Sequence, residues 1–172
     1  IKKLADESKL IADIVINDFW SYKVYEKAVP KKKAKVITII SCFYDMNKLD
    51  TFVNDVVKVL DEDGILVIQQ NYLLTMLEQN AFDNICHEHR NYYSLTSLGS
   101  LLDRNGLEIF DTKLVEINGG SIRTYIRRKE NHNVTPFRGA EIPYISIIML
   151  SISLYVMILN RKLIYKINYA KN

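Results

Sequence analysis

The residues of this chain best suited to chemistry stand together in one short segment, where His87, Glu88 and His89 follow one another among aromatic residues. Imidazole groups exchange protons near neutral pH and also bind metal ions, and an adjacent carboxylate can orient an imidazole. In an extended segment His87 and His89 would point the same way, as two ligands of a metal ion do. Two histidines do not complete a zinc shell, and neither Cys42 nor Cys86 stands at a familiar zinc spacing. We therefore expect no metal site, which leaves acid–base catalysis and a purely structural polar loop as the open interpretations.

The composition is that of one globular domain with enough apolar residues for a core. The chain has 172 residues, of which 48% are hydrophobic and 25% charged. The net charge of +3 is far from the concentrated basic face that nucleic-acid binding needs, so we expect no nucleic-acid partner. Two cysteines are too few for a disulfide framework and indicate a reducing compartment, so we expect a cytoplasmic protein.

The first half of the chain alternates between strand and helix patterns. Residues 36–40 and 64–69 are continuous apolar runs, which is typical of strands buried on both faces. A shorter apolar run at 13–17 predicts another strand, and helical spacing over 48–60 predicts a helix between the two buried strands. Alternating strands and helices predict an α/β fold with a mostly parallel sheet.

The second half adds a helix and a hairpin. Helical spacing recurs over 94–105, and Gly106 follows in the place of a C-terminal cap. Residues 107–127 alternate between apolar and polar on both sides of Asn118 to Gly120, a strong reversal signal, and this pattern predicts an antiparallel hairpin.

The last part of the chain carries an apolar run without charges, from Ile142 to Asn160. Its length meets the lower limit for a membrane-spanning helix, but its serine and tyrosine residues favour a buried or partner-packed helix. We therefore divide the chain into a main domain over residues 1–141 and an apolar helical tail over residues 142–172, and do not favour membrane contact by the tail.

The segment LDEDGILVIQQNYLLTMLEQNAFDNICHEHRNYYSLTSLGSLLDRNGLEIFDTKLVEINGGSIRTYIRR resembles the later half of the class I methyltransferases that use S-adenosylmethionine, in the branch of sugar C-methyltransferases. The matching motifs are an aspartate and glycine at the start of a strand, an AFD and HEH pair, a Y.SL.SL helix start, a GL strand and a GGS.R.Y strand, at residues 63–64, 81–83, 87–89, 93–98, 106–107 and 119–125. The resemblance covers about residues 13–128. It implies a Rossmann-like sheet, mostly parallel with a C-terminal antiparallel hairpin. Because Ile1 opens directly into a helical pattern, we expect this sheet to be incomplete at the N-terminus.

The resemblance also implies a reaction and its catalytic residues. Such enzymes remove an acidic proton next to the keto group of a nucleotide-linked deoxysugar, and the resulting enolate carbon takes the methyl group of S-adenosylmethionine. By this resemblance His89 is the base and Glu88 positions the sugar or the imidazole, with Asp45 and Tyr44 nearby at the end of the preceding strand. Related enzymes often carry tyrosine at the position of Cys86, a phenol for which Tyr92 or Tyr93 would have to substitute.

The same resemblance assigns binding residues. The nucleotide-linked sugar would be held by His87, Asn118, Gly119 and Arg123, since an arginine fork matches phosphate oxygens. The cofactor would be held by residues after the first two strands: Asn17, Asp18, Phe19, Ser41, Cys42 and Phe43. The glycine-rich loop that completes such a site would precede Ile1, so we expect weak cofactor binding by this chain alone. A non-catalytic methyltransferase remnant, acting as a binding or partner module, is the alternative function.

Overall fold

The computed structural model describes residues 2–9, 12–117, 120–131, 154–159 and 162–167. Its helices are α1 (Lys2–Ser8), α2 (Tyr22–Ala28), α3 (Leu49–Val59), α4 (Leu73–Glu78) and α5 (Leu95–Asp103), with short 3-10 turns η1 (Phe43–Asp45) and η2 (Phe82–Asn84). Its strands are β1 (Ala34–Ile40), β2 (Leu60–Asn71), β3 (Leu107–Val115), β4 (Ser121–Arg128), β5 (Leu154–Leu159) and β6 (Lys162–Ile167).

The six strands form one mixed sheet in the order β3-β4-β2-β1-β5-β6. The central strands β1 and β2 are parallel, with Ile37 opposite Leu66 and Ile39 opposite Ile68. β5 continues the parallel part, whereas β4 runs antiparallel to β2 and to β3, and β6 antiparallel to β5. The predicted α/β fold class, inner strands and closing hairpin are therefore confirmed, although Asn118 and Gly119 at the tip of the hairpin lie outside the described residues.

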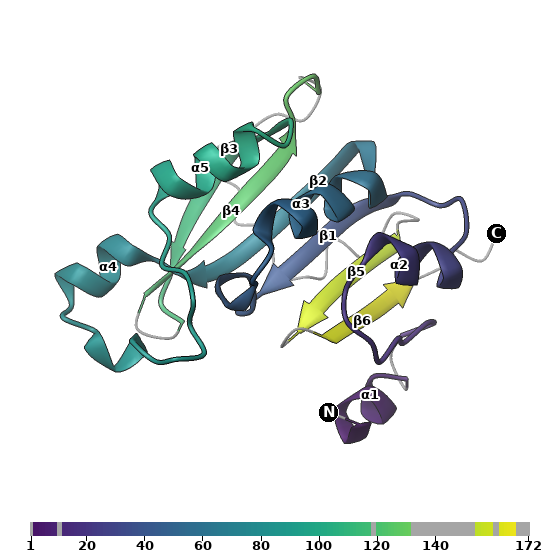
Figure 1. Cartoon of the computed structure of the whole chain (residues 1–172), viewed down its shortest axis with the longest axis horizontal. Helices are drawn as coiled ribbons and strands as arrows, with labels where there is room; N and C mark the ends of the chain where they lie inside the picture. Colours follow the sequence, from purple (N-terminus) through teal and green to yellow (C-terminus); the bar gives the residue numbers. More distant parts are fainter. Residues whose placement is uncertain (1, 10–11, 118–119, 132–153, 160–161, 168–172) are drawn as a thin grey trace.

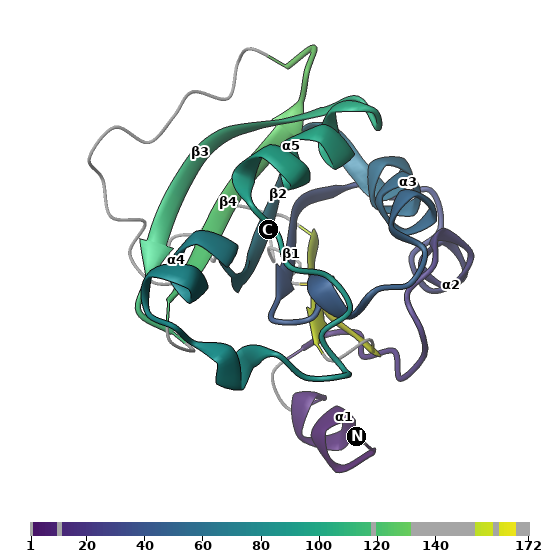
Figure 2. The same ribbon diagram turned by 60° about the vertical axis from the view of Figure 1, so that its left-hand side comes forward.

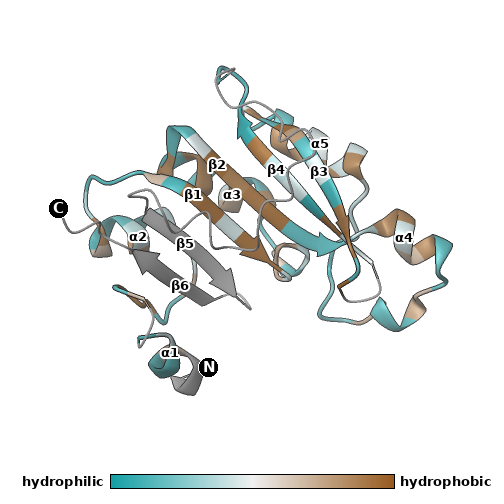
Figure 3. Cartoon of the chain, turned by 180° about the vertical axis from the view of Figure 1, so that it is seen from behind, coloured by the Kyte–Doolittle hydropathy of each residue, from teal (hydrophilic) through white to brown (hydrophobic). Residues whose placement is uncertain are grey.

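Helices α2, α3 and α5 cover one face of the sheet (Figures 1 and 2). α3 buries an apolar stripe at helical spacing, formed by Phe52, Val53, Val56 and Val59. These side chains belong to the same core as Ile37, Ile39, Leu66 and Ile68 of the inner strands. Figure 3 shows the opposite face, which these three helices leave uncovered, with apolar residues along β1 and β2. This shared core and the parallel pairing of β1 and β2 place the carboxyl ends of the two strands side by side at one edge of the sheet.

Two expectations about secondary structure are wrong. Residues 13–17 form no strand, although Ile14 and Ile16 lie half-buried against the core. An apolar run forms a strand only where its backbone finds a partner in a sheet. The tail, expected to be helical, contains β5 and β6 within its described part, while residues 142–153 lie outside the described residues. Periodicity alone does not separate a buried helix from a buried strand in a continuous apolar run, and partners in a sheet decide between them. Within the described ranges, no helix is long and apolar enough to cross a membrane.

The backbone requires glycine at position 120, in the connection between β3 and β4. Its φ angle is +105°, and a Cβ atom there would lie 2.1 Å from Cγ2 of Thr75 in α4. We expect Gly120→Ala to lower the free energy of unfolding by about 1 to 3 kcal/mol, measured by urea denaturation. Gly99→Ala is the matched control, because Gly99 lies inside α5 with nothing within 4 Å of its Cβ position. That change should raise stability by about 0.5 to 1 kcal/mol, and an equal loss in both variants would contradict the account.

Candidate active site

A polar cavity lies at the carboxyl ends of β1 and β2, where ligands bind in open α/β sheets. η1 follows β1, and α4 and η2 follow β2 and project beyond the strand ends (Figure 1). Between them is a cavity of about 600 Å³. It is lined by Tyr44, Asn71, Gln79, Asn80, Ala81, Asp83, Asn84 and His89. The cavity therefore brings together two of the four predicted catalytic residues, Tyr44 and His89.

The loop that carries His89 is fastened to η1 by hydrogen bonds. The backbone N–H groups of Arg90 and Asn91 donate to the carbonyl oxygen of Tyr44, at 3.2 and 3.0 Å. The side-chain amide of Asn91 donates to the same oxygen and to the carbonyl oxygen of Met46, at 3.1 Å each. As a result the ring of His89 packs edge to face against the ring of Tyr44, with 4.4 Å between their centroids.

The second contact of His89 fixes which of its nitrogens carries the proton. Nδ1 lies 2.8 Å from the carbonyl oxygen of Asn84 in η2. A carbonyl oxygen only accepts hydrogen bonds, so Nδ1 must be the protonated nitrogen of the neutral ring. Nε2 then keeps a free lone pair. His89 is half-buried, and in this tautomer Nε2 is the nitrogen that can act as a general base.

Tyr44 supplies a hydrogen-bond donor beside this base. Burial, together with the neighbouring Asp45 carboxylate, raises the pKa of the Tyr44 phenol above its ordinary value. The phenol therefore stays protonated at neutral pH and can donate to an oxygen atom that gains negative charge. Asp45 itself is half-buried next to Tyr44 and is absent from the described lining of the cavity.

Two further tyrosines were candidates to replace the phenol missing at Cys86, and the structure separates them. The Tyr92 hydroxyl donates to the carbonyl oxygen of Asn84 at 3.4 Å, which places it beside His89. Tyr93 is buried in the core instead, its ring 5.5 Å from that of Phe43. Of these two candidates, Tyr92 is therefore the one that lies near His89.

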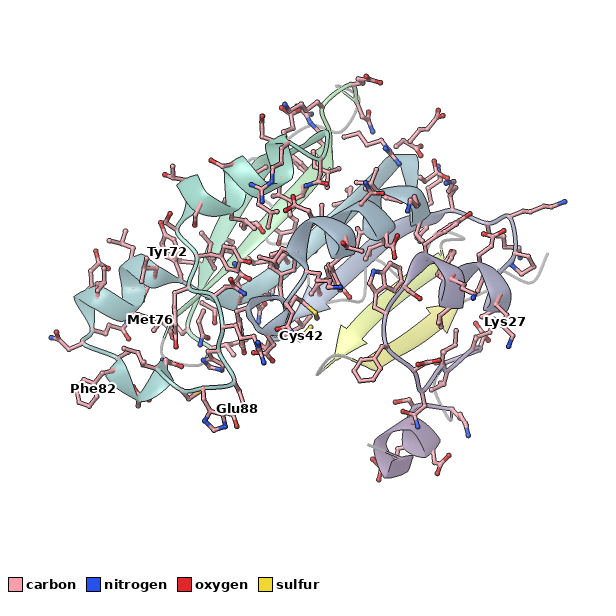
Figure 4. The ribbon with its side chains drawn as sticks, in the orientation of Figure 1. Lys27, Cys42, Tyr72, Met76, Phe82 and Glu88 are labelled. Atoms are coloured by element: carbon pink, nitrogen blue, oxygen red, sulfur yellow. The ribbon has the colours of Figure 1, made fainter. Side chains whose placement is uncertain are left out.

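His87 and Glu88 lie apart from the cavity. The two residues form a turn, so the extended geometry that would align His87 with His89 is not present. The side chains of His87 and Glu88 are 91% and 61% exposed and approach each other to 3.2 Å. Figure 4 shows Glu88 at the outer edge of its loop. The backbone at Glu88, the Cys86 thiol and His87 all hold the pKa of the Glu88 carboxyl below its usual value. No group of three or more metal-ligating side chains occurs in the part of the chain that the structure describes.

Arg123, predicted to bind substrate, is engaged elsewhere. It stands opposite Gln69 in the β2–β4 ladder and donates to Gln69 Oε1 through Nε at 2.9 Å and through Nη2 at 2.6 Å. Both residues lie on the sheet face away from α3 and α5, because the neighbouring Ile68 belongs to the helix-facing core. The other two predicted contacts, Asn118 and Gly119, lie outside the described residues.

The predicted cofactor residues form two neighbouring segments. Trp20, directly after Phe19, packs against Phe52 with 6.2 Å between ring centroids, and Phe52 packs against Phe43 at 5.8 Å. Asn17, Asp18 and Phe19 are exposed, and Ser41 is half-buried with φ +51° at the end of β1. Cys42 and Phe43 are completely buried, backbone included, so neither residue is accessible to a ligand in this structure.

Three asparagines were missed by sequence reasoning. Asn91 fastens the loop to η1, Asn84 orients His89, and Asn71 at the end of β2 donates from Nδ2 to Asn84 Oδ1 at 3.0 Å. No spacing signal marks them, because Asn71 and Asn84 are 13 residues apart and Asn91 and Tyr44 are 47 apart.

The sequence was compared with known proteins. The pattern of a family described as a methyltransferase domain matches residues 6–112. A curated protein, the C-methyltransferase NovU of Streptomyces niveus, is 33% identical over 104 residues, which cover 60% of this chain and 25% of that protein. The chain thus spans about a quarter of the length of this relative.

Solved structures of methyltransferases are also similar. The mitomycin 7-O-methyltransferase MmcR aligns with a TM-score of 0.45 and 17% identity, over 56% of this chain and 30% of that one. Magnesium protoporphyrin IX methyltransferase from Synechocystis PCC 6803 aligns with a TM-score of 0.43 and 12% identity, over 56% and 46%. Because the family match extends over more than half of the chain, and the α/β sheet brings a polar cavity to the strand ends, the protein belongs to the methyltransferase-domain family.

Proposed function

We propose that this protein transfers a methyl group from S-adenosylmethionine to a carbon atom of a nucleotide-linked keto-deoxysugar. The observation that carries the proposal is the contact between His89 Nδ1 and the carbonyl oxygen of Asn84, which leaves Nε2 as a base at the cavity. Carbon is a poor nucleophile until a proton next to a carbonyl group has been removed, so a C-methyltransferase of this kind needs such a base. The similarity to a curated C-methyltransferase supports the same reaction class.

Each residue of the cavity has a defined part in this reaction. His89 Nε2 takes the proton from the carbon next to the ketone, and the electron pair of that C–H bond moves into the enolate. The protonated Tyr44 phenol donates a hydrogen bond to the ketone oxygen, which carries the negative charge of the enolate. S-adenosylmethionine, when bound, supplies the electrophilic methyl group for the enolate carbon. The proton on His89 later leaves to solvent, to which the half-buried ring has access.

The proposal is tested by identifying the product. The enzyme, including any residues that precede Ile1, is incubated with S-adenosylmethionine carrying a 13C-labelled methyl group and with thymidine diphosphate-linked 4-keto-6-deoxyglucose. We expect carbon NMR to show the labelled methyl group bonded to a ring carbon next to the ketone. A label on oxygen would contradict C-methylation. Binding of both ligands without any product would favour the non-catalytic binding module.

Tyr44→Phe should lower the methyl-transfer rate by roughly 10²-fold, because it removes one donor to the enolate oxygen while keeping the ring that packs on His89. Tyr93→Phe is the matched control. The Tyr93 hydroxyl is buried and has no hydrogen-bond partner among the described residues. Its loss should leave the rate within about twofold of the parent rate. The measurement is the steady-state rate of methyl transfer at saturating cofactor. Equal rates for Tyr44→Phe and the parent would show that the Tyr44 hydroxyl takes no part in the reaction.

A further inference from the structure

One residue of the cavity wall carries a buried acceptor atom for which the described residues supply no donor. Asn71, the last residue of β2, is 9% exposed and lines the cavity. Its Nδ2 donates to Asn84 Oδ1 at 3.0 Å. Its Oδ1 is buried and has no hydrogen-bond partner within the described part of the chain. Because the amide nitrogen is already engaged, the group left for a ligand is a fixed acceptor.

A buried acceptor without a donor is costly, and native proteins satisfy such groups with a ligand or with water. The ligand atom that meets Asn71 Oδ1 must therefore carry a hydrogen, as a hydroxyl group does. A ketone oxygen or a C–H group at that place would leave the acceptor unsatisfied. Such a site rejects ligands that lack the hydroxyl.

The charges around the cavity indicate what kind of group enters it. The lining supplies amide groups from Asn71, Gln79, Asn80 and Asn84, and a carboxylate from Asp83. Among the described residues, no lysine or arginine lines this cavity. Amides and a carboxylate suit a neutral ring with hydroxyl groups and disfavour a phosphate group.

Asn71 and the proposed base, His89, are both hydrogen-bonded to Asn84. Asn84 accepts two hydrogen bonds. Its side-chain oxygen accepts from Asn71 Nδ2, and its backbone oxygen accepts from His89 Nδ1. A hydroxyl group held by Asn71 Oδ1 therefore stands in a fixed relation to His89 Nε2. This relation selects which carbon of the ring faces the base.

We propose that Asn71 is a specificity-determining residue, whose Oδ1 accepts a hydrogen bond from one hydroxyl group of the sugar ring and thereby places the acidic carbon against His89. This inference rests on the proposed function, because it concerns the substrate of the same cavity.

The experiment measures the affinity of a ligand series by calorimetry. The probes are thymidine diphosphate-linked 4-keto-6-deoxyglucose and analogues in which each ring hydroxyl in turn is replaced by hydrogen. We expect the parent protein to bind one analogue about 10- to 100-fold more weakly than the complete sugar. In Asn71→Ala that difference should shrink to about twofold. In Asn71→Asp, Asn84 can turn its amide and donate from Nδ2 to the new carboxylate, so an oxygen acceptor stays in place and the discrimination should be kept.

Several outcomes overturn the inference. They are an unchanged discrimination in Asn71→Ala, equal binding of all analogues by the parent, or no binding of any probe. If Asn71→Ala does not fold, Asn71→Asp carries the test, and loss of discrimination there overturns the inference. Discrimination that depends on Asn71 in a protein that forms no methylated product would leave this inference standing and refute the methyl-transfer proposal. A protein that forms the methylated product but shows no such discrimination would overturn this inference and leave the methyl-transfer proposal standing.

Discussion

Replacing His89 by alanine is expected to lower the methyl-transfer rate by about 10²- to 10⁴-fold, the usual contribution of a positioned general base. The reason is the arrangement of its two nitrogens, Nδ1 on the Asn84 carbonyl and Nε2 free at the cavity. Fold and binding should survive, because the loop stays fastened to η1 through Asn91. The measurement is the initial rate of product formation, with circular dichroism to show that the variant is folded.

His87→Ala is the matched control for this variant. His87 lies two residues away, and its side chain is 91% exposed outside the cavity, so the rate should change by no more than about twofold.

Glu88→Gln separates two interpretations of the HEH motif. The resemblance assigns Glu88 a positioning role and predicts a loss of activity, whereas its exposed position beside His87 predicts a small effect. A large loss would show that Glu88 turns toward the cavity when the sugar is bound.

Phe43→Ala is expected to lower the free energy of unfolding by about 3 to 5 kcal/mol, a large part of the stability of an ordinary domain. Phe43 is 0% exposed, and its ring lies 5.8 Å from that of Phe52 and 5.5 Å from that of Tyr93. Truncation would remove the contact between α3 and the segment that ends at Tyr93, directly behind the cavity. Chemical denaturation of both proteins measures the difference.

Phe82→Ala is the control for the loss of a phenylalanine ring. Phe82 opens η2, near the same cavity, but is 77% exposed. Its loss should change the free energy of unfolding by less than about 0.5 kcal/mol. A small effect for Phe43→Ala together with lost cofactor binding would identify Phe43 as a ligand contact rather than a core residue.

The elements with a strong local pattern could be predicted from the sequence. The helix over residues 48–60 is α3, and the apolar run at 64–69 lies within β2. Gly106 has a positive φ of +74°, but it lies two residues beyond Arg104, the C-cap of α5. The helices α2 and α4 were not predicted, because seven and six residues are too short to show a helical period. The helix predicted for the apolar run of the tail was wrong for a different reason, because a continuous apolar run is compatible with both a helix and a buried strand.

The site could be predicted only in its chemical groups. The resemblance to sugar C-methyltransferases pointed to His89 and Tyr44, and the structure brings both to one cavity. The sequence contained no information on the direction of each side chain in the HEH turn, so Glu88 and His87 were grouped with His89 although they face solvent. Nor did it show the asparagines, whose hydrogen bonds join segments far apart in the chain.

The most direct test of the account is the exchange of the sugar's acidic hydrogen in deuterated water, without S-adenosylmethionine. Thymidine diphosphate-linked 4-keto-6-deoxyglucose is incubated with the parent protein, with His89→Ala and with His87→Ala, and proton NMR follows the hydrogen on the carbon next to the ketone. The account predicts that the parent protein and His87→Ala replace this hydrogen by deuterium, while His89→Ala is slower by about 10²-fold or more. Exchange by His89→Ala at the parental rate would contradict the account.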